Sequence, residues 1–521
     1  MKLRKTVVTL RNAAVCFLTV LIFASSASSA KEPLNLLFIL TDNQPASIIG
    51  SYGNKDVRTP HIDQLAAEGM RFTNAFAVNG MCSPTRATLM TGLLPSQHGV
   101  HNWLDDEELK HWPKDWSAVA EYRTLPYTLS QRGYQTAMIG KWHLGQPWQA
   151  SIGYQHWVTF TDGHTVDFWN NTVIENNQQY TVADQHIVDF FADKAVEYIA
   201  QHDKKKPFYL QLNFDGPYLN PPTNTGPAKN RHYQSYLDSK FESFPRLAVN
   251  PNILEQLSDP DVPAFLKGMH KQSILHNNDP ETLANVASQN TIVDDGVGKV
   301  MKALKEAGMH KNTLVVFSSD QGNFYGQHGL WQHITVTTPA NLYEAALNIP
   351  LIVKHPGKIR AGAVNERLIG QYDIPGTLLD YLHVSDVQFE KSPGRSFVSV
   401  MRGDDASWDD TVYYEQEESR GVRTQHYAYW KRLPQVGGNA LYDMQTDPQQ
   451  NTNLIGQQEL QEVIRELDRK VDAFFERYSV PKYDLWNGGT AKGSVMRPYM
   501  FKRLYGEDWE PVTEAVRVFE E

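Results

Sequence analysis

The sequence predicts an α/β fold, with a large, mostly parallel sheet sandwiched by helices and a smaller C-terminal antiparallel α+β subdomain. Short apolar runs alternate with helical patterns from residue 34 onward, which is typical of a parallel sheet. Beyond about residue 385 the runs become shorter and are separated by turn residues, which favours antiparallel strands. A chain of 521 residues is also too long for one simple core, so two structural parts are expected.

Five apolar runs in the N-terminal part are expected to form buried strands. They are residues 34–41, 136–139, 207–214, 313–317 and 349–354. Two further segments have helical spacing. One covers residues 61–67, after a Thr59-Pro60 start signal, and the other covers residues 281–308.

Polar side chains follow the carboxyl ends of four of these strands. They are Asp42, Lys141, Asp215 and Asp320. In open parallel sheets, ligand sites form at this edge. We therefore expect the four residues to share one site.

The C-terminal part has a different pattern of apolar and polar residues. Short runs at residues 411–415, 427–431 and 440–442 precede a helical pattern at about 458–478. We therefore expect an N-terminal α/β domain over residues 31–385 and an α+β subdomain over residues 386–521. The stretch 481–521 has weak periodicity and supports no interpretation.

The first 30 residues have the features of a secretory signal peptide. Four basic residues, Lys2, Arg4, Lys5 and Arg11, accompany an apolar run at 13–24 and the small residues Ser28-Ser29-Ala30. The apolar run is too short for a comfortable membrane span, so we expect no stable membrane insertion. The prediction is a secreted or periplasmic protein that is cleaved near Ala30.

The charge balance argues against a nucleic-acid partner. Removal of residues 1–30 takes away four positive charges and changes the formal net charge from −10 to −14. A protein this acidic is a poor general binder of nucleic acid or anionic membranes. A polyanionic ligand would need a local basic pocket.

The mature chain is expected to contain one cysteine, Cys82, because Cys16 leaves with the signal peptide. No intramolecular disulfide can then form, although the protein is exported. A lone thiol in such a protein is either a buried, inert side chain or a residue with a chemical role.

The residues around Cys82 favour a chemical role. Residues 82–92 read Cys-Ser-Pro-Thr-Arg-Ala-Thr-Leu-Met-Thr-Gly. This segment resembles the signature Cys-x-Pro-x-Arg followed by Thr-Gly of the sulfatases, an alkaline-phosphatase-like family. The resemblance implies that a formylglycine-generating maturation enzyme oxidises Cys82 to formylglycine (3-oxoalanine).

This modification has a chemical rationale. A hydrated aldehyde carries two hydroxyls on one carbon, so that one can attack sulfur and the other can then expel sulfate. Pro84 and the following residues are expected to place residue 82 at a helix N-terminus, which favours negative charge. Arg86 would hold the oxygens of the nucleophile by charge-assisted hydrogen bonds.

Two further segments resemble the metal-binding strand ends of the sulfatases. Residues 38–43 (FILTDN) supply Asp42 and Asn43, and residues 316–322 (VFSSDQG) supply Asp320 and Gln321. Together with residue 82, these oxygen ligands suit Ca²⁺, with Mg²⁺ as the less favoured ion. The same residue pairs are also common in ordinary turns.

Three more segments resemble sulfate-binding and proton-transfer parts of the family. GKWHLG at 140–145 implies that Lys141 binds a sulfate oxygen and that His143 assists the nucleophile. GLWQH at 329–333 places His333 where a sulfate-binding cation is usual. FDGPYLNPP at 214–222 departs from the family, because Tyr218 stands where a leaving-group histidine is common.

The resemblance extends over residues 34–455 in family order, including RGVRT at 420–424 and LYDMQTDPQQNTNL at 441–454. It implies a sulfatase that acts on a sulfated polysaccharide or oligosaccharide, and the 12 Trp and 24 Tyr suit sugar stacking. The alternatives are a phosphate ester hydrolase and a catalytically silent polysaccharide-binding protein on the same fold. Within the sulfatases, aryl and steroid sulfates compete with sugars as substrates. The sugar, the sulfate position, endo or exo action and the oligomeric state stay open.

Overall fold

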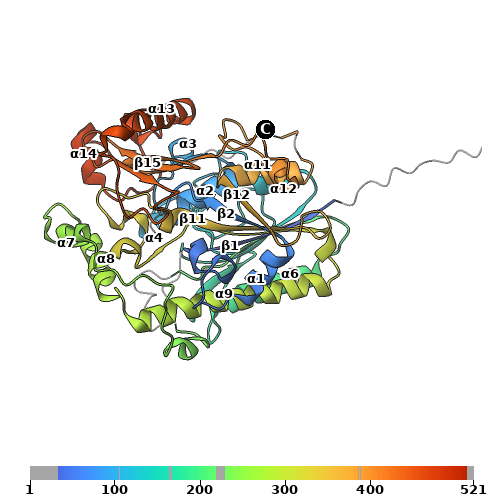
Figure 1. Cartoon of the computed structure of the whole chain (residues 1–521). Coiled ribbons are helices and arrows are strands. Elements are labelled where there is room, and N and C mark those ends of the chain that lie inside the picture. Colours follow the sequence, from blue (N-terminus) through green and yellow to red (C-terminus); the bar gives the residue numbers. More distant parts are fainter. Residues whose placement is uncertain are drawn as a thin grey trace, which may run out of the picture. The chain divides into compact units, whose positions relative to one another are not determined.

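A ten-stranded sheet forms the centre of the computed structural model of this protein (Figure 1). Its strands, in spatial order, are β12 (Ala363–Gly370), β2 (Met70–Phe76), β11 (Asn348–Lys354), β8 (Thr313–Ser319), β1 (Asn35–Thr41), β7 (Phe208–Asn213), β3 (Gln135–Gly140), β4 (His156–Phe160), β5 (Asn171–Glu175) and β6 (Gln178–Val182). The structure describes residues 33–104, 106–163, 167–218, 229–384, 386–387 and 389–512. The expected signal peptide, residues 1–30, lies outside these residues.

The middle of this sheet is parallel and its flanks are mixed. The strands β8, β1, β7, β3 and β4 run parallel in that order. On one flank β11 is antiparallel to both β8 and β2, and on the other β5 and β6 form an antiparallel hairpin. The predicted α/β class with a mostly parallel sheet is confirmed. The antiparallel direction of β11 was not predicted, because a buried apolar run looks the same in either direction.

The central strand β1 shows why the sheet is covered on both sides. All seven of its residues are buried. Leu36, Phe38 and Leu40 belong to one apolar cluster, and Leu37 and Ile39 belong to another. Because successive side chains of a strand point to opposite faces, the two clusters are the two faces of the sheet.

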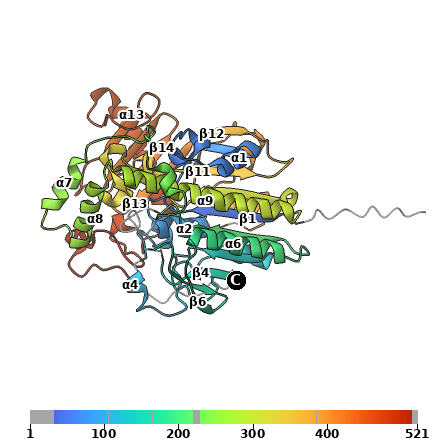
Figure 2. The ribbon, with the colours of Figure 1, turned by 90° about the horizontal axis from the view of Figure 1, so that it is seen from below.

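Helices cover both faces, as Figures 1 and 2 show. One face carries α1 (Pro60–Glu68), α6 (Ile187–Gln201) and α9 (Pro280–Glu306). The other face carries α2 (Cys82–Thr91), α5 (Leu125–Gln131), α11 (Asp373–Tyr381) and α12 (Val398–Arg402). Shorter or peripheral helices are α3 (Pro95–His98), α4 (Asp106–Leu109), α7 (Pro251–Ser258), α8 (Ala264–Leu275) and α10 (Glu344–Leu347).

The long helix α9 begins as its sequence predicts. The side chain of Asp279 accepts a hydrogen bond from the backbone N–H of Thr282 over 2.8 Å, and Pro280 occupies the first turn.

The C-terminal part contains a second, antiparallel sheet with a helix packed on it. Its strands are β13 (Thr411–Gln416), β14 (Ser419–Thr424), β15 (Tyr427–Arg432) and β16 (Ala440–Asp443). The helix α13 (Gln461–Tyr478) buries Leu467, Val471 and Phe475, which recur every four residues. The predicted antiparallel sheet is confirmed, and β14 is an additional strand. The described residues, from 33 to 512, cluster as one compact unit, and the boundary near residue 385 stays a prediction.

The final described stretch is folded, although its sequence supported no interpretation. It contains α14 (Pro498–Tyr505), and a small apolar cluster includes Leu485, Val495, Phe501 and Trp509. In the described part of the chain, no helix is both long and apolar enough to cross a membrane.

A buried polar site at the carboxyl edge of the sheet

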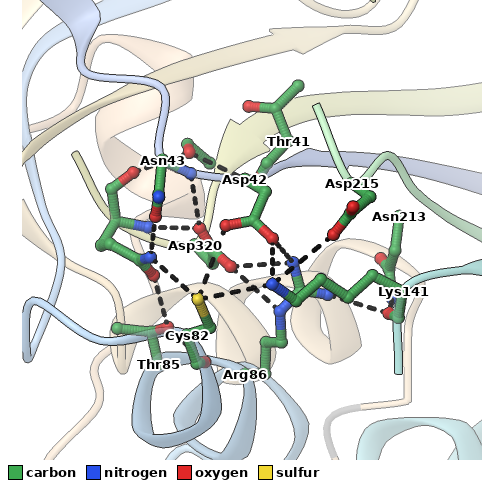
Figure 3. A network of polar contacts seen from close by, with 12 residues as sticks. Thr41, Asp42, Asn43, Cys82, Thr85, Arg86, Lys141, Asn213, Asp215 and Asp320 are labelled. Atoms are coloured by element: carbon green, nitrogen blue, oxygen red, sulfur yellow. Dashed lines mark hydrogen bonds and ion pairs between the residues drawn. The ribbon is translucent and has the colours of Figure 1, made fainter. Parts of the chain in front are cut away.

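The four strand-end residues that the sequence singled out lie close together. The strands β8, β1, β7 and β3 are neighbours in the sheet, so their carboxyl ends meet. The ammonium group of Lys141 forms an ion pair with Asp42 and lies 3.6 Å from Oδ1 of Asp215. Asp320 joins the group through its contact with the backbone N–H of Asn43, at 3.2 Å (Figure 3). All of these side chains are buried.

Gly140 allows β3 to deliver Lys141 to this site. Its φ of 114° lies in the left-handed region, and a Cβ there would stand 1.8 Å from the carbonyl oxygen of Asn213. The backbone N–H of Lys141 donates to that same carbonyl over 2.9 Å. The close approach of β3 and β7 therefore requires glycine at position 140.

Cys82 is the first residue of α2. The sequence predicted this place at a helix N-terminus, because Pro84 follows two positions later. All ten residues of α2 are buried, although half of them are polar. Such a helix needs an internal partner for each polar group. Thr85 donates to the carbonyl of Cys82 over 2.7 Å, and Thr88 donates to the carbonyl of Leu93 over 2.7 Å. These contacts fix the helix, and with it the position of residue 82.

Three polar groups surround the sulfur of Cys82 (Figure 3). Its Sγ lies 3.2 Å from Nε2 of Gln321, 3.5 Å from Nζ of Lys141 and 3.5 Å from Oδ1 of Asp42. Burial raises the pKa of the Cys82 thiol, and the charge of Asp42 raises it further, against the opposing effect of Lys141. The unmodified side chain is therefore a neutral thiol in this environment.

Arg86 lies one turn further along α2 and contacts both carboxylates that are expected to bind the metal ion. Its Nε and Nη2 lie 2.9 and 2.8 Å from Oδ2 of Asp320, and Nη2 lies 3.5 Å from Oδ2 of Asp42. Its Nη1 donates to the carbonyl of Lys141 over 2.9 Å. Burial and the negative charge of Asp42 raise the pKa of Asp320 to about 6, although Arg86 opposes this.

The two amides of the predicted metal set also converge. The side chain of Gln321 donates to Oδ1 of Asn43, and Asn43 has a positive φ of 59°. The hydroxyl of Tyr325 donates to the carbonyl of Asn43 over 3.2 Å. This contact holds a backbone conformation that few residue types adopt readily.

The remaining predicted residues lie around this group. The ring of Tyr218 is 4.8 Å from Nζ of Lys141 and 6.4 Å from the ring of His333. His333 contacts the side-chain nitrogen of Asn43 at 3.4 Å, and burial lowers its pKa to about 4, so its imidazole is neutral near pH 7. His143 contacts the carbonyl of Leu104 at 3.0 Å through Nε2, which must carry the proton.

The donor set fits a hard divalent cation. One ligand atom from each of Asp42, Cys82 and Asp320 lies within 4.8 Å of the others. The amide group of Gln321 adjoins them, because its Nε2 donates to Oδ1 of Asn43 and lies 3.2 Å from Sγ of Cys82. Carboxylate and amide oxygens are the ligands that Ca²⁺ prefers. With Asp215, three carboxylates face the two cations Lys141 and Arg86, which leaves one net negative charge. A divalent cation would reverse that sign and favour an anionic ligand.

The structure brings Asp215 into the site, as its place at a strand end predicted, and it faces Lys141. It also adds a residue that the sequence did not place there. Gln371 donates through Nε2 to the carbonyl of Asp320 over 2.7 Å and accepts from the backbone N–H of Val78 over 3.3 Å. Gln371 directly follows β12, a strand that was not predicted, so no local signal marked it.

Comparison with known proteins connects this geometry to a family. A family model described as Sulfatase matches residues 34–384, and one described as N-sulphoglucosamine sulphohydrolase, C-terminal, matches residues 326–477. An N-acetylglucosamine-6-O-sulfatase of Bacteroides thetaiotaomicron is 25% identical over 88% of this chain and 90% of that protein. An ulvan-active sulfatase of Formosa agariphila is 25% identical over 89% of each chain.

Solved structures show the same fold. A putative sulfatase from Bacteroides fragilis superimposes with a TM-score of 0.69 at 24% identity, over 88% of this chain and 99% of the other. A protein in complex with its substrate D-glucosamine-2-N,6-O-disulfate gives a TM-score of 0.65 at 23% identity, over 86% and 98% of the two chains. Because the Sulfatase model matches more than half of the sequence, this protein belongs to the sulfatase family of sulfuric ester hydrolases.

Proposed function

We propose that this protein hydrolyses sulfate esters on a sulfated carbohydrate and that it does so outside the cytoplasm, after loss of residues 1–30. One observation carries the proposal. Cys82, which begins the signature segment of a sulfatase-family chain, lies with its Sγ inside a buried cluster of Asp42, Lys141 and Gln321. Cations and carboxylates around one reactive position suit the binding of an anionic ester.

The nucleophile of the proposed reaction derives from Cys82 after oxidation to formylglycine by a maturation enzyme. Its hydrate supplies a hydroxyl that attacks sulfur and a second hydroxyl whose deprotonation releases sulfate. The position at the N-terminus of α2 supports this assignment, because the helix dipole stabilises developing negative charge there. Arg86 orients the carboxylate of Asp320 toward the same position.

The remaining side chains bind the ester and move protons. We assign Lys141, whose Nζ is 3.5 Å from Sγ, to a sulfate oxygen. His143 accepts the proton of the second hydroxyl through its imidazole, and the neutral His333 donates a hydrogen bond to sulfate. Tyr218, beside Lys141, protonates the departing sugar oxygen.

A calcium ion completes the proposed site. Asp42, Asn43, Asp320 and Gln321 would hold it together with residue 82, and Mg²⁺ is the less favoured ion. When bound, the ion would supply positive charge beside the sulfate group and so act as a Lewis acid. The cationic side chains of the site would then have to neutralise a smaller part of the negative charge of the ester.

The substrate class rests on relatives. The relatives include an N-acetylglucosamine-6-O-sulfatase, an ulvan-active sulfatase and the human N-sulphoglucosamine sulphohydrolase, which is 29% identical over 68% of this chain. All three names refer to sulfated carbohydrates. They differ in the sugar, so the proposal extends to the class and leaves the individual sugar to experiment.

The test is sulfate release from a panel of sulfated oligosaccharides by protein produced with a formylglycine-generating enzyme. We expect release from at least one member and a peptide mass that shows Cys82 converted to formylglycine. Cys82→Ser and Cys82→Ala should each abolish turnover while their thermal unfolding stays close to that of the wild type. Full activity with an unmodified thiol would contradict the mechanism. Release of phosphate from a matched panel of sugar phosphates, with no release of sulfate from the sulfated panel, would favour the phosphate ester hydrolase.

A further inference from the structure

A tryptophan-lined cavity of about 620 Å³ lies beside the proposed active site. Its walls include Trp112, Trp142 and Trp148, together with the cations Lys110 and Lys114. This volume is within the usual range for small-ligand pockets. Figure 2 shows α4, β4 and β6, the elements next to this cavity, in the lower part of the view, where the sheet ends with β6.

The cavity adjoins the catalytic residues through the chain itself. Trp142 and His143 line it, and they directly follow Lys141, whose Nζ is 3.5 Å from Sγ of Cys82. Consecutive Cα atoms are only 3.8 Å apart, so the cavity wall begins within about 8 Å of the Cα of Lys141. His143, to which the proposed mechanism gives a role at residue 82, is thus also part of the cavity wall.

The aromatic walls are held in place by hydrogen bonds. Gln146 donates to the carbonyls of Leu109 and Trp112 over 2.5 and 3.3 Å, and it accepts from Nε1 of Trp148 over 2.9 Å. Trp142 packs edge-on against Trp157 with ring centroids 5.1 Å apart. The rings therefore stand on two segments that are tied to each other, which reduces the entropy lost when a ligand binds.

The exposure and charge of the lining side chains indicate which ligands the cavity can bind. Trp148 is 41% exposed, so a ligand in solution can reach its ring. Lys110 and Lys114 are both exposed, with Lys110 paired to Glu107 at 2.5 Å, and Asp162 is the acidic residue of the lining. Flat aromatic faces beside flexible cations suit a sugar ring that carries sulfate or carboxylate groups.

We propose that this cavity is an accessory sugar-binding site for the part of the carbohydrate chain next to the sulfated sugar, with Trp148 stacking on a ring and Lys114 pairing with an anionic substituent. The inference rests on the proposed function for its carbohydrate class. It adds that the protein favours oligosaccharides over monosaccharide sulfates, because only the longer ligand can fill both places.

Kinetics with ligands of two lengths test the proposal. Trp148→Ala should raise KM about three- to tenfold for a sulfated tetrasaccharide and leave KM for the matching monosaccharide sulfate unchanged. Trp148→Phe keeps a ring and should restore most of the affinity. Lys114→Gln should weaken tetrasaccharide binding in a salt-dependent manner, whereas Lys302→Gln, on the exposed face of α9, should have no effect. Equal effects on both ligand lengths, or none, would overturn the accessory site.

Direct binding separates this inference from the catalytic proposal. Cys82→Ala protein, with and without Trp148→Ala, is titrated calorimetrically with heparin-, ulvan- and carrageenan-derived tetrasaccharides. A loss of affinity caused by Trp148→Ala for any of the three supports the accessory site, even if no sulfate is ever released. Identical affinities in both proteins, or no binding of any tetrasaccharide, would refute it.

Discussion

The guanidinium group of Arg86 lies 2.8 Å from Oδ2 of Asp320, and the two side chains are 2% and 0% exposed. The pair connects the first turns of α2 with the end of β8, so it joins the proposed nucleophile helix to the proposed metal site. A buried ion pair is costly to break, because the remaining charge has no water to solvate it.

We predict that Arg86→Ala lowers the free energy of unfolding by about 3–5 kcal/mol, because Asp320 then remains buried without its cation. Urea denaturation monitored by tryptophan fluorescence measures this loss. Arg465→Ala, which breaks an exposed pair with Glu462 on α13, should cost less than about 1 kcal/mol. Similar losses in the two variants would show that the buried pair contributes no more to the free energy of unfolding than the exposed pair.

Removal of calcium should lower both sulfate release and Tm. A ligand that binds only the folded state at about 100 times its Kd adds about 2.7 kcal/mol of stability, so Tm should rise with calcium concentration. Differential scanning calorimetry after chelation, with Ca²⁺ or Mg²⁺ added back, measures the effect.

A matched pair of variants locates that ion. Asp42→Asn should abolish the rise of Tm with calcium concentration. Asp295→Asn should retain it, because Asp295 belongs to a second group of ligand-type side chains, with His61 and Asp294, elsewhere in the fold. The opposite pattern would place the ion at that second group.

Tyr218→Phe distinguishes proton donation from packing. If Tyr218 protonates the departing sugar oxygen, the variant should lose about 10²- to 10⁴-fold in kcat on a sugar sulfate. It should lose far less on an aryl sulfate with an activated phenolate, which leaves without a proton. Losses of equal size on both substrates would assign Tyr218 to substrate positioning. Full activity on both would remove it from the mechanism.

His186 should make stability depend on pH. It accepts from the backbone N–H of Val188 over 3.3 Å at the start of α6 and stacks on Phe168. Burial, aided by the charge of Arg231, lowers its pKa to about 3, whereas an unfolded histidine titrates near 6.5. Between these values the unfolded chain binds more protons, so the free energy of unfolding falls as pH falls, by up to about 1.4 kcal/mol per pH unit.

His186→Asn retains a capping side chain without this titration and should flatten the pH dependence between about pH 6.5 and 3. Urea midpoints across that range, with His111→Asn as an exposed control, measure the difference. Parallel pH profiles for the wild type and His186→Asn would show that another group dominates the acid sensitivity.

Much of the fold was predictable because its signals are local. The runs that became β1, β3, β7, β8 and β11 are continuous apolar segments, and α9 carries its cap and first-turn proline in the sequence. The strands β2 and β12 were missed, because each mixes polar and apolar residues that acquire their partners only in the folded sheet.

The sequence by itself determined the family, the α/β class and the residues at four strand ends, since signature motifs, apolar runs and turn residues are properties of neighbouring positions. Only the tertiary structure decided the individual contacts within the site. Asp215 reaches Lys141, and Gln371 holds the carbonyl of Asp320, because strand order sets neighbours that lie far apart in the chain. The sequence also left the protonation state of His333 open. Its imidazole is neutral because burial lowers its pKa, and burial results from the packing of the folded chain.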